Sequence, residues 1–455
     1  MAKTKYKTVW YCSECGADAP KWSGRCPSCG AWNTMVEERV AATPSRSPSP
    51  VSRAQSQAVA LNDISAEEQP RIILPSAELN RVLGGGLVPG AMVLIGGEPG
   101  VGKSTLVLQN LLAIKKRTIL YASGEESATQ LKMRADRLGR GSDNLFVVCE
   151  TSLERILDHI EAVQPGIVVI DSIQTIASDA LDSSAGSVSQ VRECAARLLN
   201  YAKTSGVPVL MIGHITKDGA LAGPKVLEHI VDAVLQFEGD RQYMFRILRA
   251  IKNRFGSTSE LGIYEMCQRG LREVTNPSEL LLGDMSQELS GVAIGVTVEG
   301  ARPFLIEVQS LVSTAAYGTP QRSVTGFDSK RMNMLLAVLE KRVGFKLAAK
   351  DVFLNIAGGL KVNDPALDLP VVCAILSSNF DTPVSRDTCM AGEVGLSGEI
   401  RPVARMEQRV AEAEKLGMAR MLVPKGSLKG ADTARFKIKI LEVSRVEEAF
   451  RLLFA

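Results

Sequence analysis

The chain has 455 residues, of which 45% are hydrophobic, and a length of this kind predicts about three domains rather than one core. A net charge of only +3 excludes a protein that is basic over its whole surface, so any nucleic-acid surface must be local. The nine cysteines come without a signal peptide or an apolar run of about 18 residues, which favours a soluble cytoplasmic protein and argues against a membrane protein.

Residues 1–36 predict a small four-cysteine zinc module. So short a segment needs a metal to hold a core. The spacing CxxC-x10-CxxC suits four thiolate ligands around a tetrahedral zinc ion, and the ligands are Cys12, Cys15, Cys26 and Cys29. Two roles stay open for the tryptophans at positions 10, 22 and 32. They stack on nucleic-acid bases beside the local basic residues, or they form the module's own core.

Residues 37–70 are expected to form a flexible linker. They are rich in Ser, Pro, Ala, Arg and Gln, as in TPSRSPSPVSRAQSQ. This composition lacks the apolar residues that a packed core requires. We therefore expect the zinc module to move on a tether.

Residues 71–275 predict an α/β nucleotide-binding domain. Several expected strands are continuous runs of Val, Ile and Leu, which suit a sheet covered on both faces. They alternate with helices, as in P-loop cores. The expected strands are MVLIGG, TILYAS, LFVVCE, GIVVIDS, PVLMIGH, AVLQFE and YMFRILRAIKN.

The stretch GEPGVGKST fits the phosphate-binding signature GxxxxGK[ST] between a predicted strand and a predicted helix. In such a loop, backbone N–H groups and the helix N-terminus surround phosphate oxygens. Lys103 then reaches the β and γ phosphates, and Ser104 holds magnesium. The sequence thus predicts a bound nucleoside triphosphate. The nucleotide-binding residues are Gly97, Glu98, Pro99, Gly100, Val101, Gly102, Lys103, Ser104, Thr105 and Asp171.

Polar residues follow several of the predicted strands. Asp171 ends the run IVVI, where a carboxylate can bind magnesium together with Ser104. Glu125 and Glu126 follow TILYAS, and either one is placed to be the general base or simply to begin a helix. Gln174 and His214 are candidates for sensing the γ phosphate, or are structural.

Two Gly/Ser-rich connections, residues 178–190 and 216–225, follow strands of the same sheet. We expect them to move during hydrolysis, although they are also compatible with plain surface loops. Lys217 and Lys225 make the second a candidate contact for the phosphate backbone of DNA.

The motif KNRFG lies at a tight connection between two predicted strands. An isolated basic turn of this kind is usually solvated. In a P-loop ATPase, Lys252 and Arg254 can instead reach the γ phosphate of a neighbouring subunit, as an arginine finger does in trans. That role requires a head-to-tail ring or filament.

The motifs together resemble one known family. CPSCGAWNT, LGGGLVPG, GEPGVGKS, YASGEES, VVIDSIQT, GHITKDG and KNRFG are similar to the motifs of RadA (Sms), the bacterial recombination and repair ATPases with a RecA/DnaB-like core. The resemblance spans essentially the whole chain. It implies ATP as the nucleotide, Glu125 as the catalytic glutamate, and Lys252 and Arg254 as an intersubunit finger. It also implies a hexameric ring that moves on single-stranded DNA and extends branched recombination intermediates with the RecA recombinase.

Residues 285–455 resemble the proteolytic domain of Lon, which uses a serine–lysine dyad. Lon's Pro-Ser-Ala-Gly aligns with residues 365–368, so Ala366 stands at the nucleophile position. Counting from Gly392 places Glu407 at the lysine position. The resemblance therefore implies a scaffold that lacks the dyad. Two roles stay open for the basic residues of this segment, which either face DNA or are simply solvated. These residues are Lys330, Arg331, Lys341, Arg342, Lys346 and Lys350.

Two other functions stay open at this point. One is a RecA-fold regulatory ATPase that binds proteins instead of DNA. The other is an ATP-dependent protease, against which the missing dyad argues.

Overall fold

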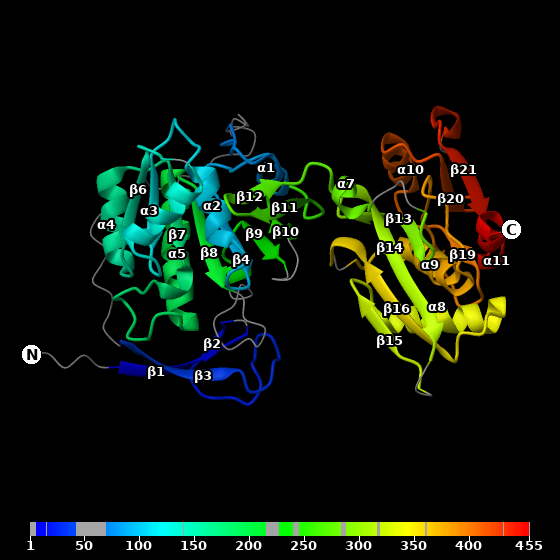
Figure 1. The fold of residues 1–455 in the computed structure, drawn as a ribbon. Coiled ribbons are helices and arrows are strands. Elements are labelled where there is room, and N and C mark those ends of the chain that lie inside the picture. The colour runs from blue at the N-terminus through cyan, green and yellow to red at the C-terminus, as the bar shows by residue number, and fades with distance from the viewer. Residues whose placement is uncertain are drawn as a thin grey trace, which may run out of the picture. The chain divides into compact units, whose positions relative to one another are not determined.

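The structure is a computed structural model, and it describes residues 6–14, 16–41, 70–139, 141–214, 227–239, 245–283, 288–315, 319–359, 362–430 and 432–454. The chain divides into two compact units, Met1–Glu273 and Val274–Ala455 (Figure 1). Among the described residues, none of the helices has the length and apolar character needed to cross a membrane.

The zinc module is a three-stranded antiparallel sheet of order β2-β1-β3. Its strands are β1 (Tyr6–Cys12), β2 (Asp18–Ala19) and β3 (Met35–Ala41). The last strand pairs with β1 along its whole length and so continues past residue 36, where the sequence suggested that a linker begins. The remainder of that expected linker, residues 42–69, lies outside the described part.

A nine-stranded sheet forms the body of the first unit, in the order β12-β11-β10-β9-β4-β8-β7-β5-β6. The six neighbouring strands β9, β4, β8, β7, β5 and β6 run parallel to one another. β10 pairs with β9 in the antiparallel sense, and β11 and β12 continue the sheet as antiparallel neighbours. All seven predicted strands are confirmed. The bounds are β4 Met92–Gly97, β5 Ile119–Ser123, β6 Leu145–Cys149, β7 Ile167–Asp171, β8 Val209–His214, β9 Ala233–Glu238, β10 Phe245–Asn253, β11 Leu261–Cys267 and β12 Gly270–Glu273.

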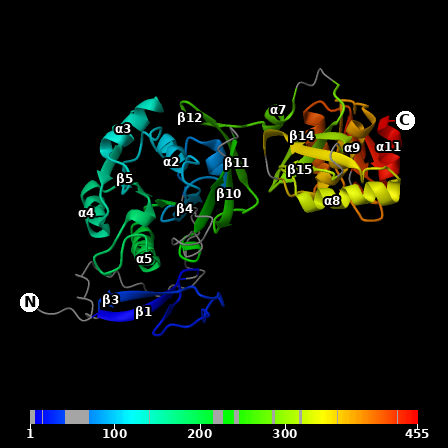
Figure 2. The same ribbon diagram turned by 60° about the horizontal axis from the view of Figure 1, so that its bottom comes forward.

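Helices cover both faces of this sheet (Figures 1 and 2). One core joins the sheet to α1, α2 and α3, and a second core on the other face joins it to α4 and α5. Serine side chains cap the N-termini of α1, α3, α4 and α5, which fixes where these helices begin. The edge strand β6 departs from the expected cover, because Phe146 is 48% exposed. The helices are α1 Ala77–Val82, α2 Lys103–Leu111, α3 Ala128–Arg137, α4 Leu153–Val163 and α5 Val188–Ser205.

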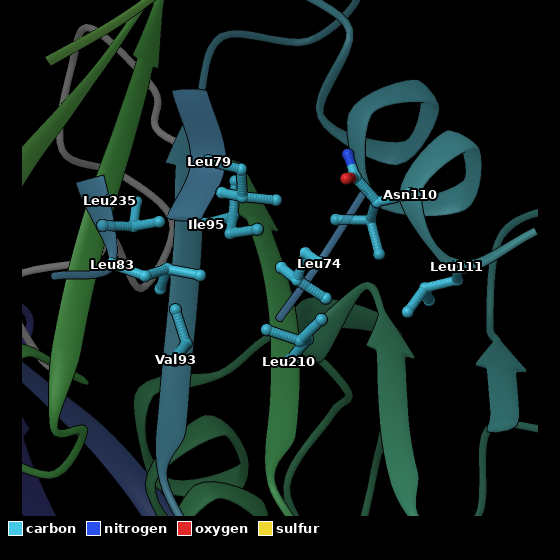
Figure 3. Close-up of a pocket in the computed structure, with 10 residues that line it drawn as sticks. Leu74, Leu79, Leu83, Val93, Ile95, Asn110, Leu111, Leu210 and Leu235 are labelled. Carbon is cyan, nitrogen blue, oxygen red and sulfur yellow. The ribbon is translucent and has the colours of Figure 1, made fainter. Parts of the chain in front are cut away.

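A small apolar cavity lies in the first of these cores, between α1, α2, β4 and β8 (Figure 3). Asn110 supplies the one polar side chain among the ten that line it, and its amide is already used. Asn110 Oδ1 accepts from the backbone N–H of Ser76 at 3.0 Å, and Nδ2 donates to the carbonyl of Leu106 at 2.9 Å. The cavity is therefore a gap in packing and does not mark a binding site for a polar ligand.

The second unit is built on a seven-stranded sheet of order β15-β16-β14-β13-β17-β20-β21, with a separate β18–β19 pair. Helix α9, buried along most of its length, packs on β13 and β14. The strands are β13 Val292–Glu299, β14 Arg302–Thr314, β15 Arg322–Thr325, β16 Lys350–Ile356, β17 Thr388–Met390, β18 Glu393–Val394, β19 Ile400–Arg401, β20 Arg420–Pro424 and β21 Lys439–Val443. The helices are α7 Pro277–Leu281, α8 Ser329–Val338, α9 Asp368–Phe380, α10 Met406–Lys415 and α11 Val446–Phe454.

Candidate functional site

The predicted phosphate loop connects β4 to α2, so its last residues form the first turn of a helix. Two signature glycines are favoured by the local geometry, Gly97 by close approach to backbone and Gly102 mainly by its positive φ. A Cβ at Gly97 would lie 2.4 Å from the carbonyl oxygen of Phe237, and one at Gly102 would lie 2.9 Å from Cε of Met266. Gly102 also has φ 112°, in the left-handed region that favours glycine. The backbone can therefore curve around an anion at the start of α2.

Lys103 is buried in this loop, with 4% of its surface exposed. Its ammonium donates to the carbonyl oxygens of Gly97 at 2.8 Å and Glu98 at 3.0 Å. It also lies 3.2 Å from Nδ1 of His214, the last residue of β8. Burial lowers the pKa of Lys103 to about 8, against the opposing effect of Asp171 and Glu125. The ammonium of Lys103 thus lies beside the backbone of the phosphate loop, where it can bind phosphate oxygens.

Asp171 is the last residue of β7 and is buried. The hydroxyl of Tyr121, two residues before the end of β5, donates to Oδ2 of Asp171. Tyr121 is fully buried, and burial together with Asp171 raises its pKa well above the ordinary value, so its hydroxyl remains a donor. Sequence reasoning missed this residue. The signal was the one aromatic of the strand TILYAS, whose hydroxyl lies among the apolar residues Ile119, Leu120 and Ala122 of that sequence.

The two adjacent glutamates after β5 differ in their surroundings. Oε1 of Glu125 accepts from the hydroxyl of Ser172 and lies 3.0 Å from Nε2 of His214. Glu126 instead forms an ion pair with Arg134 of α3, and burial raises the pKa of its carboxyl. The structure thus places Glu125 within the cluster that contains Lys103 and turns Glu126 toward α3.

These groups meet because β4, β5, β7 and β8 are parallel neighbours whose carboxyl ends share one edge of the sheet. The register pairs Gly97 with His214 and Ser123 with Asp171. Gln174 joins the same edge, since its Nε2 donates to the carbonyl of His214 at 3.2 Å. The donor set of one carboxylate and one hydroxyl near a phosphate loop fits magnesium, with Asp171 and Ser104 as the residues that would hold it.

The buried side chain of Gln190, in α5, hydrogen-bonds to the backbone of the connection at residues 178–190. Its Oε1 accepts from the N–H of Ser178 at 2.8 Å, and its Nε2 donates to the carbonyls of Ser178 and Leu181, each at 3.1 Å. The second expected loop, at residues 216–225 with Lys217 and Lys225, lies outside the described part.

The KNRFG residues occupy the opposite end of the sheet from the phosphate loop. Lys252 donates to the carbonyls of Glu228 and Val231, and Arg254 lies 3.3 Å from Oδ1 of Asp232. The N–H of Met92, the first residue of β4, donates to the same Asp232 carboxylate at 3.0 Å. The six-residue strand β4 therefore separates this motif from the loop at its other end, by about 16 Å.

The glycine-rich motif LGGGLVPG supports the KNRFG turn, which sequence reasoning did not foresee. Gly84 has φ 82°, and a Cβ there would lie 2.9 Å from Cα of Gly256. Arg71 donates to the carbonyl of Phe255 at 2.8 Å. The first glycine of the motif is thus required by close backbone approach to the KNRFG turn.

Three of the four predicted zinc ligands converge. The Sγ atoms of Cys12, Cys26 and Cys29 lie within 4.8 Å of one another, and those of Cys12 and Cys29 are 3.6 Å apart. Thiolates around one zinc ion are separated by about 3.8 Å, so the set fits this metal. Cys15 lies outside the described residues. Gly30 adopts φ 75° directly after Cys29, as the tight knuckle turn requires.

The residue expected at the lysine position of the Lon-like unit, Glu407, points to solvent. Glu407 is exposed on α10 and forms an ion pair with Arg435 at 2.6 Å. The buried cation of this helix is Arg409, whose guanidinium lies 2.8 Å from Oδ2 of Asp364. The other oxygen of Asp364 accepts from the backbone N–H of Ala366 at 3.0 Å. Arg409 therefore lies on the same carboxylate as Ala366, whereas Glu407 lies on the exposed face of α10 and pairs with Arg435.

One of the six basic residues expected on an open surface of this unit forms internal ion pairs instead. Arg331 is committed to an internal ion pair with the fully buried Asp368 and with Glu393, so it does not belong to an open basic surface. The side chains that are exposed are Lys330, Lys341, Arg342 and Lys346.

Comparison with known proteins assigns three stretches of the chain to described families. Residues 10–37 match the rubredoxin metal binding domain, residues 71–220 match an AAA domain, and residues 308–427 match subunit ChlI of Mg-chelatase. The solved RadB recombinase structure aligns with 44% of this chain and 97% of its own, with a TM-score of 0.36 and 21% identity.

Curated relatives match almost the whole chain. The DNA repair protein RadA of Bacillus subtilis (strain 168) is 50% identical over 99% of each chain. The DNA repair protein RadA of Listeria monocytogenes is 48% identical over 99% of each chain, and that of Halalkalibacterium halodurans is 48% identical over 98% of this chain and 99% of its own. The chain belongs to the RadA family of DNA repair proteins, and its AAA domain makes it an ATPase.

Proposed function

We propose that this protein is a DNA-dependent ATPase that acts as a hexameric motor on single-stranded DNA and promotes branch migration of recombination intermediates together with RecA. The observation that carries the proposal is the separation of Lys252 and Arg254 from the phosphate loop of their own subunit. Both side chains contact the amino-terminal end of the parallel strands, while Lys103 lies at the carboxyl-terminal end.

Within one subunit, the carboxyl-terminal cluster carries the binding and activation of ATP. Lys103 and the N-terminus of α2 hold the phosphates, and Asp171 and Ser104 would hold magnesium, which neutralises phosphate charge when bound. Glu125 orients the attacking water and takes its proton, because its carboxylate is part of the cluster and is not committed to an arginine. His214 lies between Lys103 and Glu125, so it is placed to respond to an arriving phosphate.

Across subunits, Lys252 and Arg254 complete the site. A side chain of about 6 Å does not cover a strand length of about 16 Å, so the motif does not serve its own phosphate loop. A head-to-tail ring brings the amino-terminal end of one sheet toward the carboxyl-terminal end of the next. The cations then stabilise the charge on the transferred phosphoryl group, as an arginine finger does.

We propose a scaffold role for the Lon-like unit and no peptidase activity. Ala366 has no nucleophilic atom, and Arg409 cannot take the place of a lysine base, since a guanidinium stays protonated. Casein degradation that persists after removal of contaminating proteases would contradict this part of the proposal.

The test of the main proposal is ATP hydrolysis with and without single-stranded DNA. We expect stimulation by DNA, DNA binding that weakens steeply with salt, and loss of turnover in Lys103→Ala. A hydrolysis rate that no DNA alters, with no DNA binding at low salt, would contradict the proposal and favour a regulatory ATPase that binds proteins. Strand displacement on a forked DNA with defined tails then tests movement and its direction.

A further inference from the structure

We propose that the zinc module binds unpaired nucleic-acid bases by stacking on Trp22 and Trp32. The inference rests on the proposed action on single-stranded DNA and assigns a specific contact surface to it. The surface consists of Trp22, Trp32, Lys21 and Arg25, and we refer to these four residues as the tryptophan platform.

The three tryptophans of the module divide into one core ring and two outer rings. Trp10 packs against the buried cluster of Cys12, Cys26 and Met35. Trp22 is 57% exposed and Trp32 is 70% exposed. Large aromatic rings normally contribute to a core, and a small module has few apolar side chains with which to form one. Two exposed rings in such a module therefore mark an interaction surface.

The two outer rings lie beside the same residue. A Cβ at Gly24 would lie 3.7 Å from Cη2 of Trp22 and 3.8 Å from Cζ3 of Trp32. The backbone that carries them is fixed, because Arg25 and Trp32 form an antiparallel bridge and the N–H of Asn33 donates to the carbonyl of Gly24 at 2.8 Å. The rings thus form adjacent aromatic faces on a rigid zinc-stabilised turn, and not two unrelated side chains.

The charge at this surface favours nucleic acid over an apolar protein segment. Residues 20–34 contain two charged side chains, Lys21 and Arg25, and both are positive and exposed. The Arg25 guanidinium lies 6.0 Å from the centre of the Trp32 ring, and its Nε donates to the carbonyl of Gly30 at 3.0 Å. Aromatic faces beside cations are the combination that holds single strands, with bases on the rings and phosphates on the cations. A duplex hides the faces of its bases, so the platform selects unpaired ones.

The chain offers a direct probe, because its three tryptophans all lie within this module. Intrinsic tryptophan emission of the full-length protein therefore reports on the zinc module alone, from the platform and Trp10. We would titrate the protein with unlabelled oligothymidylate and follow emission, and in parallel measure binding by the anisotropy of a labelled oligothymidylate. Stacking should quench the emission along the same isotherm as the anisotropy. The Trp10→Phe variant, which keeps both outer rings, should show the same quenching.

The double variant Trp22→Leu/Trp32→Leu should lose the quenching and bind oligothymidylate at least about tenfold more weakly. The salt dependence of its affinity should stay unchanged, since stacking releases no counterions. Lys21→Ala and Arg25→Ala should instead each reduce the slope of log affinity against log salt by about 0.7. Zinc content and the emission of the remaining Trp10 establish that the double variant is folded. As a matched control, Leu311→Ala removes an equally exposed apolar side chain, from β14, and should leave binding unchanged.

Each alternative outcome overturns a defined statement. Suppose that anisotropy shows DNA binding, but DNA does not change the emission of the wild-type protein and the double variant binds with wild-type affinity. The platform then does not bind DNA, and the proposed function stands. If emission responds to RecA and not to DNA, the platform docks a protein and the inference is wrong. If no form of the protein binds DNA at low salt, the proposed function itself fails.

Discussion

The ammonium of Lys103 lies 3.2 Å from Nδ1 of His214, so the phosphate loop and the end of β8 are joined within the nucleotide site. The other ring nitrogen of His214 lies 3.0 Å from the carboxylate of Glu125. The side chain that should bind phosphate and the side chain that should activate water therefore share one imidazole. Any nucleotide that draws Lys103 toward its phosphates alters the contacts of His214, and through them those of Glu125.

The pKa of Lys103 makes ATP binding dependent on pH. Burial lowers this pKa to about 8 in the nucleotide-free protein, and phosphate oxygens beside the ammonium should raise it again. Above pH 8, binding should therefore take up as much as one proton, and affinity should fall by as much as tenfold per pH unit. Calorimetry at pH 8.5 in buffers of different ionisation enthalpy measures the uptake. Lys103→Arg is the control, because a guanidinium does not lose its proton. Equal proton uptake in the variant would show that another group titrates.

Glu125 and Glu126 form a matched pair for identifying the general base. We expect Glu125→Gln to lower turnover by about 10²- to 10⁴-fold while nucleotide binding is retained. Glu126→Gln should lower turnover by less than about tenfold, because its carboxylate pairs with Arg134 on α3. Single-turnover hydrolysis and binding of a fluorescent ATP analogue measure the two effects separately. A larger loss of turnover in Glu126→Gln would reverse the assignment.

Tyr121 should act as a positioning residue for Asp171. Tyr121→Phe removes one hydroxyl and keeps the buried ring, so Asp171 loses a donor to Oδ2 while the strand keeps its packing. We expect ATP binding in the presence of magnesium to require a several-fold higher magnesium concentration, while binding in its absence stays unchanged. Titration of a fluorescent ATP analogue against magnesium tests this. If the variant loses only thermal stability and its magnesium dependence is that of the wild type, the hydroxyl serves the core and not the site.

Strand content was predictable along the first unit because its parallel strands are continuous apolar runs. β4, β5 and β7 are buried at every position, and runs of this kind identify strands of a covered sheet. The phosphate loop was predictable because its glycines are required at fixed places. Tertiary relationships were not predictable in the same way. The hydrogen bond from Tyr121 to Asp171 joins residues on neighbouring strands that lie far apart in sequence, and no local pattern encodes it.

The surroundings of Glu407 were not predictable from the sequence either. Alignment by counting identifies a position along a helix but not the face that the side chain occupies. Glu407 and Arg409 are two residues apart on α10, and such residues do not share a face of a helix. Only the packing of α10 shows that Arg409 points inward to Asp364 while Glu407 points to Arg435.

The proposed action in trans of Lys252 and Arg254 predicts complementation between defective subunits. Lys252→Ala and Arg254→Ala subunits should bind ATP but hydrolyse it poorly, since their own phosphate loops are intact. Mixing them with Lys103→Ala subunits should partly restore hydrolysis, because some interfaces then combine an intact loop with an intact finger. Subunit exchange is verified with differently labelled chains. Exchange without restored hydrolysis would leave a role within one subunit, such as the contacts with Val231 and Asp232.

Arg409 and Glu407 should differ sharply in their effect on stability, although both form ion pairs from the same helix. The side chains of Arg409 and Asp364 are 3% and 9% exposed, so Arg409→Ala leaves a buried carboxylate unpaired and should lower the free energy of unfolding by about 3 to 5 kcal/mol. The partners Glu407 and Arg435 are each 51% exposed, so Glu407→Ala should change it by less than about 1 kcal/mol. Urea unfolding of the full-length chain, followed by circular dichroism, measures both. Similar changes in the free energy of unfolding for the two variants would mean that water or another cation stabilises the charge of Asp364 when Arg409 is absent. The ion pair between Arg409 and Asp364 would then not be needed to pack α10 against the segment that contains Ala366.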